Sequence, residues 1–226
     1  IKGDYVIRRI AIHQATMNMI INTSGKDNWH IFIKEDSTQD NEVKIAINTI
    51  SLSKIEYNYH NQQKNQATTI LAKKISAKGD FDKSIFTANI KSNLFIDKFI
   101  NDNIVYIQKQ DLDLNTLLYI NTEKEIYAIE NGEFDFSFLS FHLNAAIENE
   151  NNDYKINGQL TTEESSIENI FSILPENIKE KTAIFKPNGL LTCTIDFLGT
   201  IGTKVNIDLN ANYHLKKGKI ANIQTD

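Results

Sequence analysis

Apolar and polar residues alternate along most of the chain with the two-residue period of a half-buried β-strand. Polar segments such as Glu35 to Asn41 and His60 to Gln66 separate the alternating runs. The pattern predicts strands at Tyr5 to Ile12, Ala15 to Ile21, Trp29 to Ile33, Val43 to Ile50, Ser53 to Tyr59, Thr68 to Ala77, Ser84 to Asn93, Ile104 to Ile120, Glu125 to Ile129, Glu133 to Ile147, Tyr154 to Leu160, Leu190 to Leu198 and Lys204 to Leu215. We therefore expect a mostly β, largely antiparallel fold.

The run from Ile104 to Ile120 is the longest of these segments. Its apolar residues share one parity, which Gln108 and Gln110 interrupt. At about 3.3 Å per residue it would span about 55 Å, several times the length of a usual strand. A run of this length favours an extended, curved sheet over a compact sandwich, and we expect a bulge or kink within it.

Local sequence also predicts particular turns and helices. The segment from Thr23 to Asp27 has the Gly and Asp of a hairpin turn, and Gly199 to Thr203 predicts a hairpin between the last two strands. Ser165 and Glu168 fit a capping box, and the apolar residues from Ile167 to Leu174 follow a helical period. Pro175 should end this helix or open a second one, so we expect one or two short helices near residues 165–181.

Composition excludes several classes of protein. Hydrophobic residues make up 41% and charged residues 23% of the 226 residues, which is typical of a folded chain. A formal net charge of −5 argues against nucleic acid as a partner. Cys193 is the single cysteine, so no internal disulfide forms, and we expect a thiol in a strand. We treat residues 1–226 as one domain.

The sequence shows no catalytic centre, metal site or cofactor motif. The five histidines lack the spacing of metal ligands, and no phosphate-binding loop or nucleophile elbow is present. Paired carboxylates do occur at strand spacing, and a glycosidase could use that geometry. Their intervening neighbours are apolar, which favours the solvated side of half-buried strands. These pairs are Asp80 and Asp82, Asp111 and Asp113, and Glu133 and Asp135. We expect a protein that is not an enzyme.

Aromatic and aliphatic residues line both parities of the segment from Glu133 to Ile147. Phe134, Phe136 and Phe138 share one parity, and a second apolar series on the other parity begins at Leu139. An ordinary core beneath a sheet and an open groove that holds acyl chains would both produce this alternation. Periodicity leaves these two interpretations open.

Three short motifs resemble those of the AsmA family, particularly the AsmA-like proteins of the Bacteroidota. The segment from Gly25 to Trp29 is similar to the family's G-x-x-N-W turn. The segment from Ile167 to Pro175 resembles its short helix ending in Leu-Pro, and a glycine-containing strand, Gly189 to Leu198, follows. The alternating strands between these motifs extend the resemblance over nearly the whole chain.

The resemblance implies an open β-groove similar to that of bridge-like lipid transfer proteins. Its expected function is to conduct phospholipids across the periplasm in outer-membrane biogenesis. The expected partners are phospholipid acyl chains and envelope proteins, and no cofactor is expected. A groove would have as its expected floor Ile104, Tyr106, Leu112, Leu114, Leu118, Ile120, Phe134, Phe136 and Phe138. The alternative is a structural or interaction module of the envelope, a closed β-sandwich without bound lipid.

The resemblance also implies attachment to the inner membrane. Residue 1 is Ile, and the alternating pattern starts within four residues of it. We therefore expect the chain to be a segment of a longer protein whose membrane anchor lies upstream.

Overall fold

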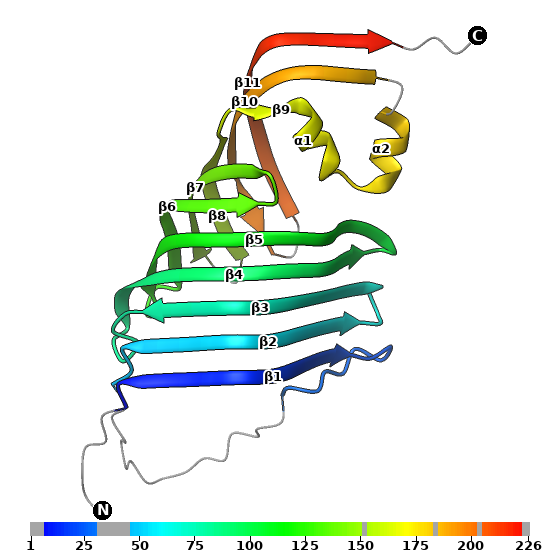
Figure 1. The fold of residues 1–226 in the computed structure, drawn as a ribbon. Coiled ribbons are helices and arrows are strands. Elements are labelled where there is room, and N and C mark those ends of the chain that lie inside the picture. Colours follow the sequence, from blue (N-terminus) through cyan, green and yellow to red (C-terminus); the bar gives the residue numbers. More distant parts are fainter. Residues whose placement is uncertain (1–6, 31–45, 151–152, 183–184, 203–204, 223–226) are drawn as a thin grey trace, which may run out of the picture.

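The computed structural model describes residues 7–30, 46–150, 153–182, 185–202 and 205–222, and it shows one large, curved, unclosed sheet (Figure 1). The sheet contains eleven strands. Their bounds are β1 (Arg9–Ile21), β2 (Thr49–Asn61), β3 (Gln66–Lys78), β4 (Ile85–Asn101), β5 (Ile104–Asn121), β6 (Ile126–Phe136), β7 (Leu139–Glu150), β8 (Asp153–Thr162), β9 (Ser165–Ser166), β10 (Phe185–Ile201) and β11 (Val205–Asn222).

The strands lie in the sheet almost in chain order. Strands β1 to β8 follow one another, and β10 and β11 complete the path, while the short β9 pairs with β10. All adjacent pairs are antiparallel except β1 and β2, which are parallel. The expected mostly β, extended, curved antiparallel sheet is therefore confirmed.

The parallel pair at the β1 edge differs from the expected hairpin. The turn after β1 forms, and Ile21 makes an isolated bridge with Asp27. The Asp27 carboxylate then accepts hydrogen bonds from the backbone N–H groups of Trp29 and His30, which curl the chain into a tight turn. The prediction of a strand at Trp29 and His30 is wrong for this reason, and residues 31–33 lie outside the described part.

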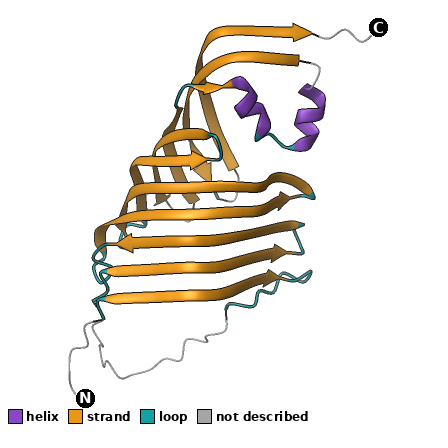
Figure 2. Cartoon of the chain, in the orientation of Figure 1, coloured by secondary structure: helices purple, strands orange, loops and turns teal. Residues whose placement is uncertain are grey.

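Two short helices, α1 (Ile167–Ser172) and α2 (Glu176–Thr182), occupy the expected segment (Figure 2). Helix α1 begins one residue later than predicted, because its N-cap is Ser166 and not Ser165. The Ser166 side chain accepts a hydrogen bond from the Asn169 N–H at 3.1 Å. Ser165 instead pairs with Leu191 as part of β9. Pro175 separates the helices, and its carbonyl accepts from the N–H groups of Ile178 and Lys179.

The strands carry kinks that change which residues share a face. Gln14 in β1 and Lys54 in β2 have positive φ angles of 59° and 53°, and they lie beside each other between paired neighbours. Each acts as an extra residue in its strand, so Ile12 and Ala15 point to the same side of the sheet. In β5, Lys109 has a φ of 53°, which agrees with the kink expected within the long run.

The segment predicted as one strand, Glu133 to Ile147, is a hairpin. Ser137 and Phe138 form a two-residue turn in which Ser137 has a φ of 55°. The apolar series changes parity because the chain reverses there. The single-strand prediction was therefore wrong. The turn was not predicted because it lacks the Gly, Asn or Asp that is typical of such turns.

The sheet has almost no buried core. Among the described residues, the buried hydrophobic side chains are Ala72, Ala88, Ile96, Leu139 and Ile167. A compact domain packs two or more layers around its core, and here one layer is a sheet whose second layer is limited to α1 and α2. Stability must therefore come mainly from backbone hydrogen bonds and from side-chain contacts between neighbouring strands.

Buried asparagines close two of the hairpins in the same way. Asn61 and Asn121 end β2 and β5 with exposed fractions of 3% and 4%. The Asn121 Oδ1 accepts from the N–H groups of Glu123 and Lys124 at 3.2 and 3.0 Å, and Asn61 bonds Gln63 and Lys64 in the same pattern. Each side chain thus satisfies two turn amides that the strand ladder does not use.

We expect Asn121→Ala to destabilise the protein by about 1–3 kcal/mol, because two backbone N–H groups lose their acceptor at a buried position. Lys124→Ala in the same turn is the matched control, since its side chain is exposed. Urea unfolding followed by circular dichroism measures both. Equal midpoints for the two variants would contradict this role of Asn121.

Candidate functional site

One face of the sheet is apolar across nearly its whole width. Cross-strand pairing places residues of successive strands side by side in rows that run perpendicular to the strands. With strands about 4.8 Å apart, such a row over the seven strands from β1 to β7 is about 29 Å long. One row contains Ile12, Leu52, Ile75, Ser92, Leu114, Phe134 and Phe141, and the next contains Ala15, Ile55, Ala72, Leu94, Leu112, Phe136 and Leu139.

This surface, which we call the apolar face, is only half covered. Most of its side chains in the middle of the sheet are half-buried, with neighbours on either side as their only cover. Exposure rises at the edges, to 46% for Ile12 on β1 and to 70% and 76% for Leu209 and Tyr213 on β11. A contiguous apolar surface of this extent marks a binding surface in soluble proteins.

A hollow of about 220 Å³ lies on the apolar face where β5 to β8 and β10 curve. This apolar hollow is lined by Leu118, Tyr127, Ile129, Ala145, Ala146, Ile147, Ile156 and Phe197. Sites for small molecules usually measure about 300–1,000 Å³. The hollow is smaller and continuous with the face around it, so its geometry suits part of a long apolar chain better than an enclosed compact ligand.

The helices leave space between themselves and the sheet. A second hollow of about 400 Å³ separates the first half of β5, at Tyr106 and Gln110, from the connection between α1 and α2 at Leu174 and Pro175. Ile167 is the buried residue of α1, and α1 contacts β9 and β10. The two helices therefore cover one end of the sheet and leave the rest of the apolar face open (Figure 2).

Six of the nine predicted floor residues share the apolar face, namely Leu112, Leu114, Leu118, Ile120, Phe134 and Phe136. The other three lie outside the apolar rows, although Tyr106 lines the hollow between β5 and the helices. Phe138 is 72% exposed in the β6–β7 turn. Ile104 and Tyr106 lie beyond the Lys109 kink, where the pairing of Phe99 and Ile100 shifts by one residue, and their exposed fractions are 40% and 41%.

Sequence analysis missed most of the residues that line the apolar hollow. Tyr127, Ile129 and Ile156 fall in segments that were correctly predicted as strands, and Ala145 and Ile147 fall in the segment whose hairpin was not predicted. Their parity within each strand was readable from sequence. Strand order and register bring these residues beside Leu118, and neither of them can be read from the sequence alone.

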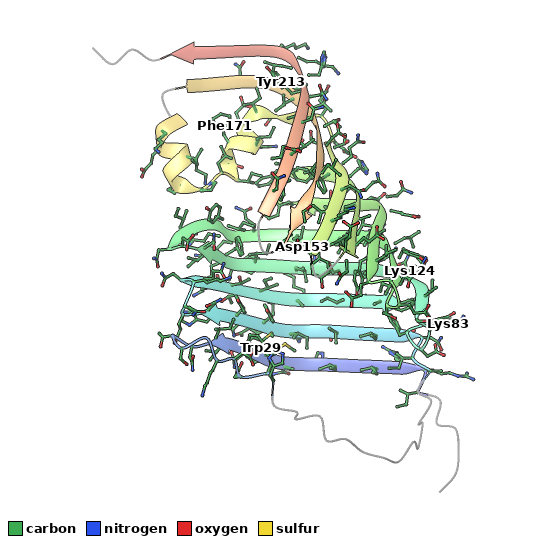
Figure 3. The ribbon with its side chains drawn as sticks, turned by 180° about the vertical axis from the view of Figure 1, so that it is seen from behind. Trp29, Lys83, Lys124, Asp153, Phe171 and Tyr213 are labelled. Atoms are coloured by element: carbon green, nitrogen blue, oxygen red, sulfur yellow. The ribbon has the colours of Figure 1, made fainter. Side chains whose placement is uncertain are left out.

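The opposite face of the sheet, the polar face, holds the candidate chemical groups. Asp111 pairs with Lys73, while Asp113 and Glu133 accept from Asn93 and Asn115. Lys83 lies at one end of the sheet (Figure 3). Its hydrogen bond and charge lower the pKa of Asp80, and the same contact raises the pKa of Lys83. These carboxylates make ordinary surface contacts. Within the described ranges, His, Cys, Asp and Glu form no cluster of three or more that could hold a metal ion.

No described helix combines the length and apolar character needed to span a membrane. Comparisons with protein-family models, curated proteins and solved structures find no match for this chain. The apolar face and its hollow are therefore the features on which a function must be argued.

Gly158 on β8 lets the wall of the apolar hollow close tightly. A Cβ atom there would lie 2.4 Å from Cζ of Phe197 and 2.5 Å from the carbonyl oxygen of Asn144. The ring could turn aside, but the backbone oxygen of β7 is fixed by the sheet.

We expect Gly158→Ala to destabilise the protein by about 1–3 kcal/mol through overpacking, with Phe197 displaced from the hollow. Asn157→Ala, one residue earlier with its side chain exposed on the polar face, should change stability by less than about 0.5 kcal/mol. Thermal unfolding of both variants measures the difference. A Gly158→Ala variant as stable as the Asn157→Ala variant would contradict the close approach.

Proposed function

We propose that this protein binds lipid acyl chains on its apolar face and passes them along it without catalysis. The observation that carries the proposal is the apolar face itself. Its two rows run from β1 to β7 with Ser92 as their one polar member, and the face has no second layer over most of its extent. A partner with a long apolar surface would remove these side chains from water.

The physical chemistry of such binding is simple. Each buried CH₂ group contributes about 0.8 kcal/mol, so a continuous apolar floor can hold a chain without specific polar contacts. Because the rows repeat with the strand spacing, neighbouring positions along them are similar in energy. A chain could then shift along the face by small steps, while its head group stays in water at the open side.

The resemblance to AsmA-like proteins adds a setting to this proposal. The segment from Gly25 to Trp29 forms a turn. Leu174 and Pro175 follow α1 in the connection to α2, and β10 comes next in the chain. By this resemblance, the ligand would be phospholipid, and the protein would act in the periplasm, anchored to the inner membrane, in outer-membrane biogenesis. The comparisons provide no independent support for that setting.

The competing function is a structural module whose apolar face is covered by another protein. The closed β-sandwich expected for such a module does not form in the described part of the chain, which folds into one unclosed sheet. A scaffold that uses the open face would purify without lipid and would not extract lipid from vesicles. These two properties separate the functions.

Two adjacent leucines provide a matched test. Leu118 lines the apolar hollow, while Leu117 projects from the polar face beside Asn89 and Glu130. We expect Leu118→Gln to reduce both the lipid retained during purification and the rate of lipid transfer between vesicles, whereas Leu117→Gln should leave both near the wild-type values. Native mass spectrometry measures retained lipid, and the dequenching of a fluorescent phospholipid measures transfer.

Wild-type protein purified from a lipid-containing host should carry phospholipid. Empty wild-type protein that also fails to accelerate transfer would exclude the proposal. If both leucine variants lost retained lipid and transfer rate equally, the cause would be a polar substitution anywhere in β5, and the apolar face would not control binding.

A further inference from the structure

Three lysines converge on the polar face of β3 and β4. Cross-strand pairing sets Lys74 opposite Asn93, Ser76 opposite Lys91, and Lys78 opposite Asn89. Lys91 therefore lies between the two lysines of the neighbouring strand. A hollow of about 410 Å³ is lined mainly by these six residues, and we call it the lysine hollow.

The lysine hollow has no bound counter-charge in the part of the chain that the structure describes. No described carboxylate lies within 4.0 Å of the ammonium groups of Lys74, Lys78 or Lys91. The adjacent positions on β2 are Thr49, Ser51 and Ser53. On β5, Asp113 is the one acidic neighbour, and it accepts a hydrogen bond from Asn93.

Some lysines elsewhere in the described part of the chain form ion pairs. Lys73 contacts Asp111, Lys155 contacts Glu150, and Lys216 contacts Glu164. Lysines left unpaired on a strand often protect a sheet edge from joining another strand. Strands β3 and β4 lie inside the sheet, between β2 and β5, so edge protection does not explain this cluster.

Charge is also segregated across the polar face. The positions beyond β5 in the same rows are acidic or uncharged, with Glu130, Glu133 and Asp135 on β6 and Asp196 on β10. The chain as a whole has a formal net charge of −5. Three lysines placed together within an acidic protein raise the local positive potential where an anion would bind.

We propose that the lysine hollow binds a ligand bearing a phosphate group or a comparable multiply charged oxyanion. The three ammonium groups, the Ser76 hydroxyl and the amides of Asn89 and Asn93 are all potential hydrogen-bond donors to such a ligand, although the Asn93 amide already donates to Asp113. Charged donors make the strongest hydrogen bonds to phosphate oxygens. This site is on the opposite side of the sheet from the apolar face. It does not depend on the proposed lipid transfer.

The test compares two triple variants with equal changes in net charge. One replaces Lys74, Lys78 and Lys91 with Gln, and the control replaces Lys64, Lys98 and Lys124, which lie outside the hollow. Pyrophosphate binding is measured by titration calorimetry at low ionic strength. Each exposed ion pair contributes a factor of about 1.4 to 5, so the loss of three should weaken binding by the hollow variant about 3- to 125-fold. The control variant should bind as the wild type does.

A second arm identifies the source of the phosphate. Sedimentation with phosphatidylglycerol vesicles, compared with phosphatidylcholine vesicles, tests a lipid head group. Binding of pyrophosphate that only the hollow variant loses supports a free phosphate compound. Binding to phosphatidylglycerol alone, again lost only in the hollow variant, supports a head group as the ligand.

Folding is checked independently, because removal of three neighbouring positive charges should leave the melting temperature unchanged or higher. A wild type that binds neither probe, or a hollow variant that binds as well as the control, overturns the proposal.

Discussion

Backbone hydrogen bonding between neighbouring strands is the constraint on which the rest of this structure depends. Five described hydrophobic side chains are buried, so no deep core holds the sheet in shape. Apart from the two-residue β9, the strands have 10 to 18 residues, and long ladders of inter-strand hydrogen bonds hold the sheet together from β1 to β11. The apolar face can stay open because the ladder, and not burial of that face, holds the strands together.

Two local devices shape the ladder. Extra residues at Gln14 and Lys54 kink neighbouring strands at the same level, so the curvature they introduce adds across the strands. The buried amides of Asn61 and Asn121 close hairpins by bonding backbone groups that the strands leave free. The polar and strained groups of both features lie outside the two apolar rows.

Much of this fold was readable from sequence, because each strand carries its own alternation. The features that sequence analysis missed depend on partners or on turn geometry. The Ser137–Phe138 turn has no typical turn residue, and the Asp27 side chain redirects a segment whose composition suits a strand. Leu112 and Phe134 were correctly grouped by parity. Ile147 and Phe197 could be placed beside Leu118 only through strand order, which a single sequence does not specify.

The order of the strands has one further consequence. Nearly every strand bonds only to its neighbours in the chain, so the sheet behaves as a one-dimensional array in which stability is a sum of nearest-neighbour terms. Insertion of a hairpin would change two interfaces and leave the others intact. The length of such a sheet can therefore change by whole hairpins, while the width of its apolar face, set by strand length, stays constant.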